Sequence, residues 1–350
     1  MSIITKSIIK KHILKLVIIF TVIHLPNALF AQTTRYLLAL SKTDKQLLLI
    51  DPVSFEIKTK IPVGNDPHEI AISKEGKIAY VSNTGSGRFH RIDVIDLKSL
   101  SALDTIDTSP LMGPHGMNYA DGKLWFTAQG SKSIGRYNPQ IQKTDLLLGT
   151  GQDRTHMLKV TSDAKKIYAT NVDAGTISAF EYKLYPPTVT PMGYALPNAK
   201  PFWDWKHTLI AVSPGIEGID LTKDEKTIWT ASPSSGKIYI VDILTRNVKE
   251  LNAHIFGANR VKLTADNHFA LISSLKTGDL AIYNVATQQE VKRLNLGTGA
   301  SEILIDNQGN RVFISCTPDN YIAIVDLRNL TVIGQIKTGG RPDGLAFAEF

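Results

Sequence analysis

Three histidines and two acidic residues recur at one position of a repeat that runs along the chain. The repeat is clearest in the segment IPVGNDPHEIAISKEGKIAYVSN, residues 61–83, and it ends with IKTGGRPDGLAF close to the C-terminus. In successive repeats this position is occupied by His68, His115, His156, Glu217, Asn259, Ser301 and Asp343. Imidazole nitrogen combined with carboxylate oxygen is a ligand set suited to zinc, iron, manganese or copper.

The spacing of these positions indicates the fold that must bring them together. The last three steps are each 42 residues (259−217, 301−259 and 343−301). A period of about 40–45 residues is typical of β-propellers, in which each unit is a blade of four strands. Apolar and polar residues alternate within the units, as expected for strands with one buried face. Most third strands end in a residue whose side chain can begin a turn, namely Asp51, Asp96, Asn138, Asp242, Asn284 and Asp326.

A large residue marks the second strand of each unit, and seven such strands can be counted, near Leu37, Tyr80, Phe126, Tyr168, Trp229, Leu271 and Phe313. The chain after the N-terminal segment opens on a second strand, 36–41, and closes on a first strand, 344–350. The two termini should therefore share one blade, which leaves no open sheet edge at the junction. The sequence predicts an all-β, seven-bladed propeller of four-stranded blades, a single domain spanning residues 32–350, with first strands lining the channel. The recurring residues, which we call the ring residues, then gather at one mouth.

Three neighbouring histidines could supply three protein ligands and leave a fourth position open, as in catalytic zinc sites. Glu217 or Asp343 would then be a fourth ligand, an orienting group or a general base. The predicted ligands of one divalent metal ion, which are also the catalytic candidates, are His68, His115, His156, Glu217 and Asp343. Their spacings of 47 and 41 residues (115−68 and 156−115) form no local metal motif. A structural alternative remains, in which each histidine bonds a neighbouring backbone carbonyl.

Basic residues flank the ring positions. Arg154 and Arg341 lie two residues before a ring residue and Arg260 lies one after, and guanidinium groups suit an anionic or carboxylate-bearing ligand. His90, in a loop of the second blade, should face the same mouth. The predicted ligand-binding residues are Arg154, Arg260, Arg341, His90, Asn259 and Ser301.

An insertion rich in proline and aromatic residues, 184–207, separates the third and fourth strands of the fourth blade. Proline does not enter a central strand, and strand direction places the insertion at the mouth opposite the ring residues. One interpretation is a flap packed on itself over the channel floor. The other is a surface for a protein partner, or for a sugar or flat ligand, formed by Trp203, Trp205, Phe202 and Tyr194.

The N-terminal 31 residues resemble a secretion signal, with four lysines, an apolar run and a cleavage point after Ala31. We therefore expect export to the periplasm or the medium, and no membrane span in the mature chain. The formal charge of +7 falls to +3 without those four lysines (7−4), which gives no support for nucleic-acid binding. A single cysteine excludes an internal disulfide, and without Cys-x-x-Cys-His covalent c-type heme is excluded. No nucleotide cofactor is expected.

The tetrad YVSN (80–83), with GNDPHEIAIS before it and IDVIDL after it, resembles the YVTN-type (YncE-like) β-propeller family. The likeness covers residues 34–350 and implies a seven-bladed propeller related to lactonase-like propellers and to metal-dependent streptogramin lyases. It implies little about activity, because one propeller scaffold hosts many functions. The sequence favours an exported binding protein whose axial pocket holds a small anionic ligand, a metal ion or both. Two alternatives remain: a metal-dependent lactonase or lyase using the same pocket, and a protein-interaction scaffold acting through the insertion.

Overall fold

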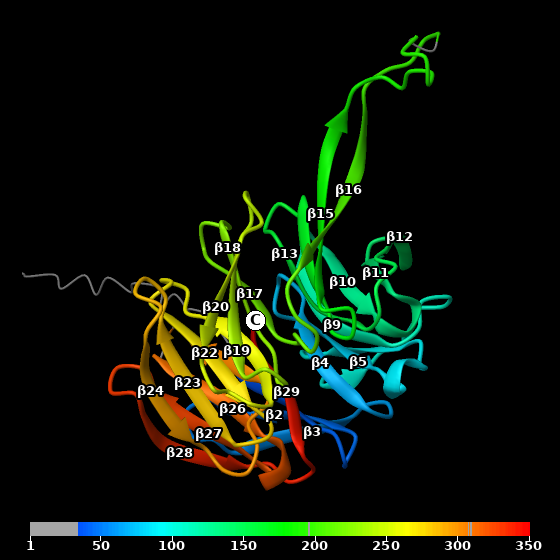
Figure 1. Cartoon of the computed structure of the whole chain (residues 1–350). Coiled ribbons are helices and arrows are strands. Elements are labelled where there is room, and N and C mark those ends of the chain that lie inside the picture. Colours follow the sequence, from blue (N-terminus) through cyan, green and yellow to red (C-terminus); the bar gives the residue numbers. More distant parts are fainter. Residues whose placement is uncertain (1–33, 195–196, 307, 309) are drawn as a thin grey trace, which may run out of the picture. The chain divides into compact units, whose positions relative to one another are not determined.

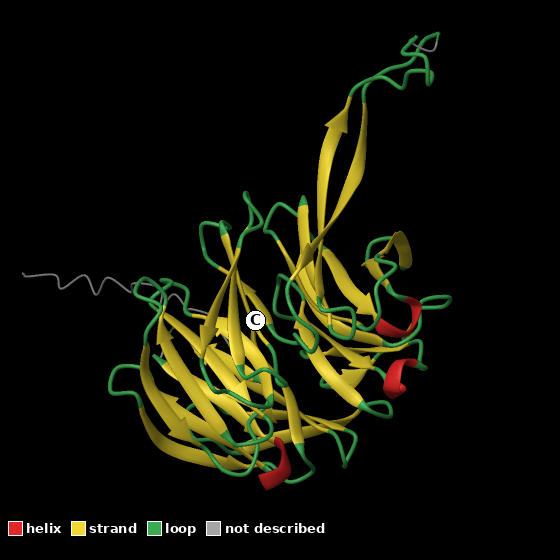
Figure 2. Cartoon of the chain, in the orientation of Figure 1, coloured by secondary structure: helices red, strands yellow, loops and turns green. Residues whose placement is uncertain are grey.

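The computed structural model describes residues 34–350 except 195, 196, 307 and 309. These residues form seven antiparallel sheets, and the first strand of each contacts the first strands of its two neighbours, so the sheets close in a circle and the predicted propeller is confirmed (Figure 1). Figure 2 shows that almost all regular structure is strand. The predicted signal peptide lies outside the described residues. No helix in the described part of the chain is long and apolar enough to cross a bilayer.

The blades are numbered 1 to 7 along the chain, and their strands run from the channel outward. Blade 1 consists of β29 (Pro342–Glu349), β1 (Arg35–Ser41), β2 (Gln46–Ile50) and β3 (Ile57–Pro62). Blade 2 consists of β4 (Pro67–Ile72), β5 (Ile78–Asn83), β6 (Arg91–Asp96) and a broken outer strand, β7 (Ser101–Ala102) and β8 (Ile106–Asp107). Blade 3 consists of β9 (Pro114–Ala120), β10 (Lys123–Ala128), β11 (Ser133–Asn138) and β12 (Lys143–Gly149).

The remaining blades follow the same order. Blade 4 consists of β13 (Thr155–Val160), β14 (Lys166–Asn171), β15 (Thr176–Tyr185) and β16 (Phe202–Ala211), and blade 5 of β17 (Ile219–Leu221), β18 (Thr227–Ala231), β19 (Lys237–Asp242) and β20 (Val248–Asn252). Blade 6 consists of β21 (Ala258–Leu263), β22 (Phe269–Ser274), β23 (Asp279–Asn284) and β24 (Glu290–Asn295). Blade 7 consists of β25 (Ile303–Asp306), β26 (Arg311–Cys316), β27 (Tyr321–Asp326) and β28 (Thr331–Lys337).

The Asp and Asn residues at the ends of the third strands begin the turns, as predicted. Asp51 Oδ1 accepts hydrogen bonds from the backbone N–H groups of Val53 and Ser54, both at 2.8 Å. The same arrangement recurs at Asp96, Asn138, Asp242, Asn284 and Asp326. Each such bond replaces a water partner of the turn backbone, which is why Asp and Asn are favoured at this position.

The two termini close the propeller through one sheet. β29 pairs with β1 from Arg35 opposite Glu349 to Ser41 opposite Pro342, and the backbones of Thr34 and Phe350 exchange hydrogen bonds. β29 is also in contact with the first strands of blades 2 and 7. Its side chains join two hydrophobic cores, because Ala346 and Ala348 pack with blade 2 residues and Leu345 with blade 7 residues. The predicted sharing of one blade by both ends is confirmed.

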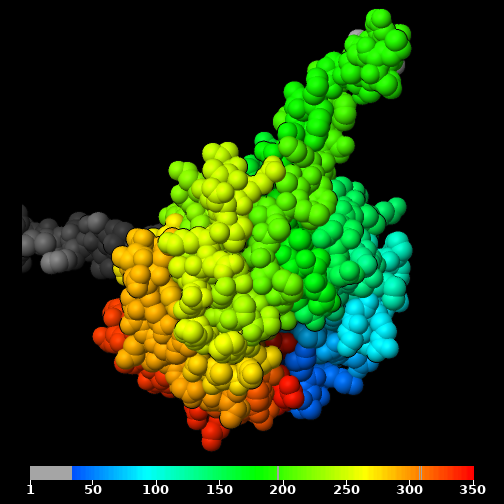
Figure 3. All heavy atoms as spheres, viewed as in Figure 1, coloured from blue at the N-terminus to red at the C-terminus, as the bar shows by residue number. Residues whose placement is uncertain are grey.

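The insertion in blade 4 differs from a self-packed flap. β15 and β16 are each ten residues long and remain paired out to Tyr185 opposite Phe202, so residues 202–207 of the insertion are strand. The paired arm extends beyond the other blades (Figures 1 and 3). Pro186 directly follows β15 and Pro201 directly precedes β16, so proline sets both limits of the ladder because it lacks a backbone donor. The arm lies at the mouth opposite the ring residues, as predicted.

Candidate functional site

Hydroxyl groups from second strands hold the ring residues in place. In four cases a Ser or Thr donates to the backbone carbonyl of the ring residue in the next blade: Thr127 to His156, Thr170 to Glu217, Ser273 to Ser301 and Ser315 to Asp343. Most of these hydroxyls also accept an N–H bond from the first strand of their own blade. These four ring residues are therefore fixed by two blades, which allows residues about 42 positions apart to share one site.

The three predicted histidines lie side by side at this mouth. The ring centroids of His68 and His115 are 4.8 Å apart, and those of His115 and His156 are 3.9 Å apart. His115 is 4% exposed, and His156 and His68 are half-buried. The structure therefore brings together three side chains that the sequence separates by 47 and 41 residues (115−68 and 156−115).

Lys42, which sequence reasoning missed, occupies the centre of one side of this cluster. Its ammonium lies 2.8 Å from His68 Nε2, 3.1 Å from Asp343 Oδ2 and 3.4 Å from Asp66 Oδ1. The lysine follows β1, which pairs with the strand that carries Asp343. Asp66 could have been found from the repeat, because it lies two residues before His68 as Arg154 lies two before His156. All three of Asp66, Arg154 and Arg341 have positive φ values of 54° to 59°.

The histidines have different protonation tendencies. Burial alone would lower the pKa of His68, but hydrogen bonds to Asp343 and Asp66 raise it. The pKa of His115 lies well below its usual value because the ring is buried and because His156 and His68 are close. Burial, followed by Arg260 and Arg154, lowers the pKa of His156 in the same way. At neutral pH, His115 and His156 are therefore neutral imidazoles in an electropositive environment.

Carboxylates near Lys42 are held ionised. Burial would raise the pKa of Asp343, but the hydrogen bond from His68 and the charge of Lys42 lower it to about 2. The pKa of Asp66 is lowered, mainly by its hydrogen bond with His68. The side of the cluster at His68 is thus charge-paired, whereas the side at His115 and His156 has no carboxylate contact among the described residues.

One polar atom at this site is left without a partner. His115 Nδ1 is buried and has no hydrogen-bond partner among the described residues. His156 Nδ1 lies 3.3 Å from Gln129 Oε1, and because an amide oxygen only accepts, this contact places the His156 proton on Nδ1. Gln129 and Arg154 both line a cavity of about 430 Å³ between the loops of blades 2, 3 and 4. Neither His115 nor His156 lines this cavity, which adjoins the cluster through Gln129.

The other ring residues of the site fall into two groups. Glu217 Oε2 accepts a hydrogen bond of 2.8 Å from Asn259, and its Oε1 lies 3.9 Å from Arg154, so these three extend the mouth beyond His156. Ser301, by contrast, is buried and bonds the Ser315 carbonyl and the Thr317 hydroxyl. Its hydroxyl therefore stabilises the blade backbone in this structure.

Arg260 lies inside the channel and not at its rim. Its side chain is 5% exposed, its Nε donates to Glu302 Oε2 at 2.8 Å, and its Nη2 contacts Glu69 of blade 2. Lys262 lies 3.2 Å from Glu302. Each of Glu69, Arg260 and Glu302 directly follows a ring residue, which is the signal that could have identified this network. The network crosses the channel beneath the histidines.

The two remaining predicted ligand-binding residues lie away from the cluster. His90 Nδ1 is 2.9 Å from Asp107, which belongs to the outer edge of blade 2, and its side chain is 55% exposed. Arg341 is exposed, and its backbone N–H bonds the Asn320 side chain. Its neighbour Pro342 begins β29, so Arg341 remains at the rim of the same mouth.

The predicted metal ligands do not form a metal site as they are arranged. In the part of the chain that the structure describes, no group of three or more His, Cys, Asp or Glu side chains is placed to hold a metal ion. The Lys42 ammonium lies among His68, Asp66 and Asp343, so a cation already neutralises these carboxylates. The metal ion stays a prediction, and it would require Lys42 to move.

Lowering the pH from 7 to 5 should destabilise the protein through His115 and His156, because the unfolded chain takes up protons that their folded forms do not. His68 has the opposite effect on stability. Its pKa is higher in the folded protein than in the unfolded chain, so its contribution to stability is fully present below the unfolded pKa of about 6.5 and is lost as the pH rises through the pKa of the folded protein. We expect His115→Gln to reduce the acid-dependent loss and His68→Gln to increase it, as measured by urea midpoints at pH 7, 6 and 5.

The exposed His268 provides the control for this series, and His268→Gln should leave the pH dependence unchanged. An equal change of the urea midpoint with pH in all of these proteins would contradict the lowered pKa of His115 and the raised pKa of His68.

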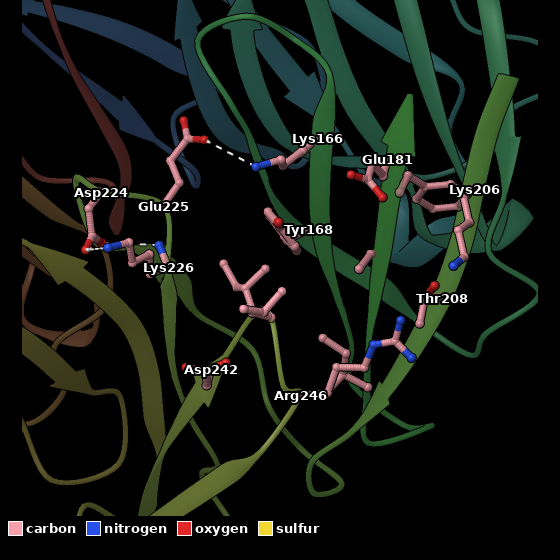
Figure 4. A pocket seen from close by; sticks show the side chains of 15 residues that line it. Lys166, Tyr168, Glu181, Lys206, Thr208, Asp224, Glu225, Lys226, Asp242 and Arg246 are labelled. Carbon is pink, nitrogen blue, oxygen red and sulfur yellow. Dashed lines mark hydrogen bonds and ion pairs between the residues drawn. The ribbon is translucent and has the colours of Figure 1, made fainter. Parts of the chain in front are cut away.

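A cavity of about 480 Å³ between blades 4 and 5 lies at the opposite end of the blades (Figure 4). Four basic residues face four acidic residues in its lining, namely Lys166, Lys206, Lys226 and Arg246 against Glu181, Asp224, Glu225 and Asp242. Lys166 lies 4.0 Å from Glu225 and Lys226 lies 3.9 Å from Asp224. These charges balance, and no residue of this lining has a buried side-chain polar atom without a partner. We place the candidate site at the ring mouth, where His115 Nδ1 has no partner among the described residues.

No family model and no curated protein matches the chain. The resemblance to the YVTN-type family therefore stays a prediction. Solved structures do match. A functionally unknown protein from Desulfotomaculum acetoxidans has a TM-score of 0.70 at 12% identity, over 90% of this chain and 99% of that chain. A putative 6-phosphogluconolactonase from Bacteroides fragilis has a TM-score of 0.67 at 17% identity, over 90% and 98%.

Hydrazine synthase from Kuenenia stuttgartiensis has a TM-score of 0.66 at 13% identity, over 81% of this chain and 90% of that chain. These three structures carry different descriptions, so they do not agree on an activity. At such identities the likeness shows the fold alone: the described chain is a seven-bladed β-propeller.

Proposed function

We propose that this protein is a binding propeller whose ring mouth takes a small anionic ligand, such as a carboxylate, at His115 and His156. The observation that carries the proposal is the buried His115 Nδ1, which has no hydrogen-bond partner among the described residues. A buried polar group without a partner costs about 1–3 kcal/mol, and a ligand that bonds it removes this cost.

The charges around His115 favour an anion. Besides burial, His156, His68, Arg260 and Lys42 depress its pKa. Of these, His156 is neutral at neutral pH, whereas Arg260 and Lys42 bring a guanidinium and an ammonium that are already in contact with carboxylates. Arg154 and Arg341 add guanidinium groups at the rim, where the Arg154 side chain is 44% exposed and lies 3.3 Å from Asp173. A carboxylate oxygen accepts hydrogen bonds from imidazole and guanidinium N–H groups, and such charge-assisted bonds are strong.

Anion binding should be coupled to proton uptake. A negative charge next to His115 and His156 raises the pKa of both imidazoles from their depressed values, so part of the bound population becomes protonated. Titration calorimetry of the full chain with citrate, gluconate and inorganic phosphate should reveal a binding anion. For that anion, the measured enthalpy should change with the ionisation enthalpy of the buffer.

The variant His115→Phe keeps the ring shape and removes the nitrogen, and it should weaken anion binding by about tenfold or more. The exposed His268→Phe is the matched control and should bind as the parent does. Absence of binding for all three anions, or equal affinity in His115→Phe and the parent, would refute the proposal.

The same preparations test the metal ion and the lactonase alternative. Elemental analysis of untagged protein beside His68→Ala/His156→Ala reveals whether stoichiometric metal depends on these histidines. A lactone panel with and without chelator reveals hydrolysis. A histidine-dependent metal would extend the proposal to a metal-assisted site, whereas its absence in protein that binds anions would leave anion binding alone.

A further inference from the structure

The paired arm of β15 and β16 has two chemically different faces. Residues directly opposite each other in an antiparallel pair lie on the same face. The pairs Phe180–His207, Tyr182–Trp205 and Leu184–Trp203 give one face that is aromatic and apolar. The pairs Glu181–Lys206 and Lys183–Asp204 give the other face charge, and only its last pair, Tyr185–Phe202, is aromatic.

The aromatic rings of this face contact one another in a row that begins in the protein core and extends outward along the arm. Trp125 of blade 3, which is 1% exposed, contacts Trp205 at a centroid distance of 6.0 Å. Tyr182 lies 5.2 Å from Trp205 and is stacked on Trp203 at 5.4 Å. Exposure increases outward, to 36% for Tyr182 and 52% for Trp203. The inner end of the series is anchored by the core, which makes the outer end a fixed platform open to solvent.

A cavity of about 440 Å³ lies at the base of this platform, between the arm and blade 3. Tyr182 and Trp205 contribute its aromatic lining, together with Leu146. Its charged lining consists of three carboxylates and two cations, namely Asp121, Asp163 and Asp204 against Arg136 and Lys165.

The charge of this cavity selects among ligands. Arg136 is already paired with Asp145 at 2.7 Å, and Asp204 Oδ1 accepts a hydrogen bond of 2.8 Å from the backbone N–H of Trp205. Asp121 and Asp204 have no ion-pair partner among the described residues. Carboxylates without a cation partner repel an anionic ligand and accept hydrogen bonds from hydroxyl groups. A flat aromatic surface beside hydroxyl acceptors suits a ring that has apolar C–H faces and a rim of O–H donors.

We propose that the arm of β15 and β16 and the cavity at its base form a binding site for a neutral oligosaccharide. One sugar ring lies in the cavity against Tyr182 and Trp205, with a hydroxyl group donating to Asp121. The chain continues outward over Trp203. This site lies at the mouth opposite the ring residues and is independent of the proposed anion site.

The test is binding of the full chain to immobilised neutral glycans, followed by tryptophan fluorescence titration with cellotetraose, maltotetraose and chitotetraose. We expect at least one neutral glycan to bind and to change the emission of the exposed tryptophans. Trp203→Ala should weaken that binding by about tenfold or more, and Trp203→Phe should weaken it less, because a smaller aromatic face remains.

Phe202→Ala is the matched control, since this ring is next in sequence and lies on the other face of the same arm. It should retain the glycan affinity of the parent, as should His115→Phe, which affects only the opposite mouth. The proposal is overturned if no neutral glycan binds, if Phe202→Ala loses as much affinity as Trp203→Ala, or if an Arg-rich peptide binds the platform and the glycans do not.

Discussion

Replacing Arg260 with methionine should lower the free energy of unfolding by about 3–5 kcal/mol, the cost of removing one partner from a buried ion pair. Arg260 is buried in the channel and connects Glu302 of blade 7 with Glu69 of blade 2. Methionine has a similar volume but no charge, so both carboxylates lose their shared cation. Denaturant unfolding followed by circular dichroism measures this loss.

The loss in Arg260→Met should also depend on pH. Burial already raises the pKa of Glu69 to about 7 despite the attraction of Arg260. Burial would raise the pKa of Glu302 as well, but Lys262 and Arg260 lower it. A raised carboxyl pKa means that stability is lost as the pH rises from the unfolded value to the folded value. Without Arg260 the Glu69 value rises further, so the variant should be closest to the parent at pH 5 and furthest from it at pH 8.

Arg328→Met is the control for lost charge, because Arg328 is exposed in the turn after β27, and it should change stability by about 0.5 kcal/mol or less. Adding Glu69→Gln and Glu302→Gln to Arg260→Met should restore part of the stability, since the unpaired charges are then gone. A loss of less than about 1 kcal/mol in the single variant would show that water or Lys262 solvates both carboxylates.

Removing residues 342–350 should abolish cooperative unfolding. This truncation deletes β29, the innermost strand of blade 1, whose Leu345, Ala346 and Ala348 are buried in two cores. It also leaves β1 paired only with β2 and opens the ring between blades 7 and 2. The affected packing is comparable with the whole stability of a domain, about 5–15 kcal/mol. Thermal unfolding and gel filtration of the truncated chain measure the effect.

Two controls test whether the effect comes from losing the β29 strand itself and not from shortening the chain. A synthetic peptide of residues 341–350 should restore a cooperative transition, by adding a strand to the exposed edge of β1. A circular permutant in which Phe350 is linked to Thr34 should fold, because these residues already exchange backbone hydrogen bonds. A truncated chain with a parent-like transition would contradict the role of β29 in closure.

The sequence contains local signals strong enough to predict the blades. Asp51 and its equivalents mark the turns because their side chains bond backbone that is only two residues away. The ends of the paired arm in blade 4 are also set by a local signal, because Pro186 and Pro201 have no backbone N–H to donate to a hydrogen bond between the strands. What the sequence did not reveal was that the stretch from Phe202 to His207 remains paired with β15, because that pairing depends on a partner strand across the insertion.

The candidate site was predicted in part. The sequence repeat predicted that five residues share one mouth, namely His68, His115, His156, Glu217 and Asp343, because equivalent positions of a closed repeat lie on one ring. It did not predict that Lys42 would neutralise Asp343, because Lys42 reaches the site from a turn of blade 1. Nor did it predict the buried position of Arg260, because the network with Glu69 and Glu302 spans three blades.

The amino-acid sequence by itself determined the number of blades, the closure by both termini and the ring of histidines and acids. The reason is that a repeat of fixed length puts the same position of every blade at the same mouth of the propeller. Tertiary structure alone decided which of these residues are charged, paired or left without a partner. The physical reason is that pKa values and hydrogen-bond partners depend on burial and on side chains a few ångströms away in space. For His115 those neighbours come from other blades, which no local pattern in the chain specifies.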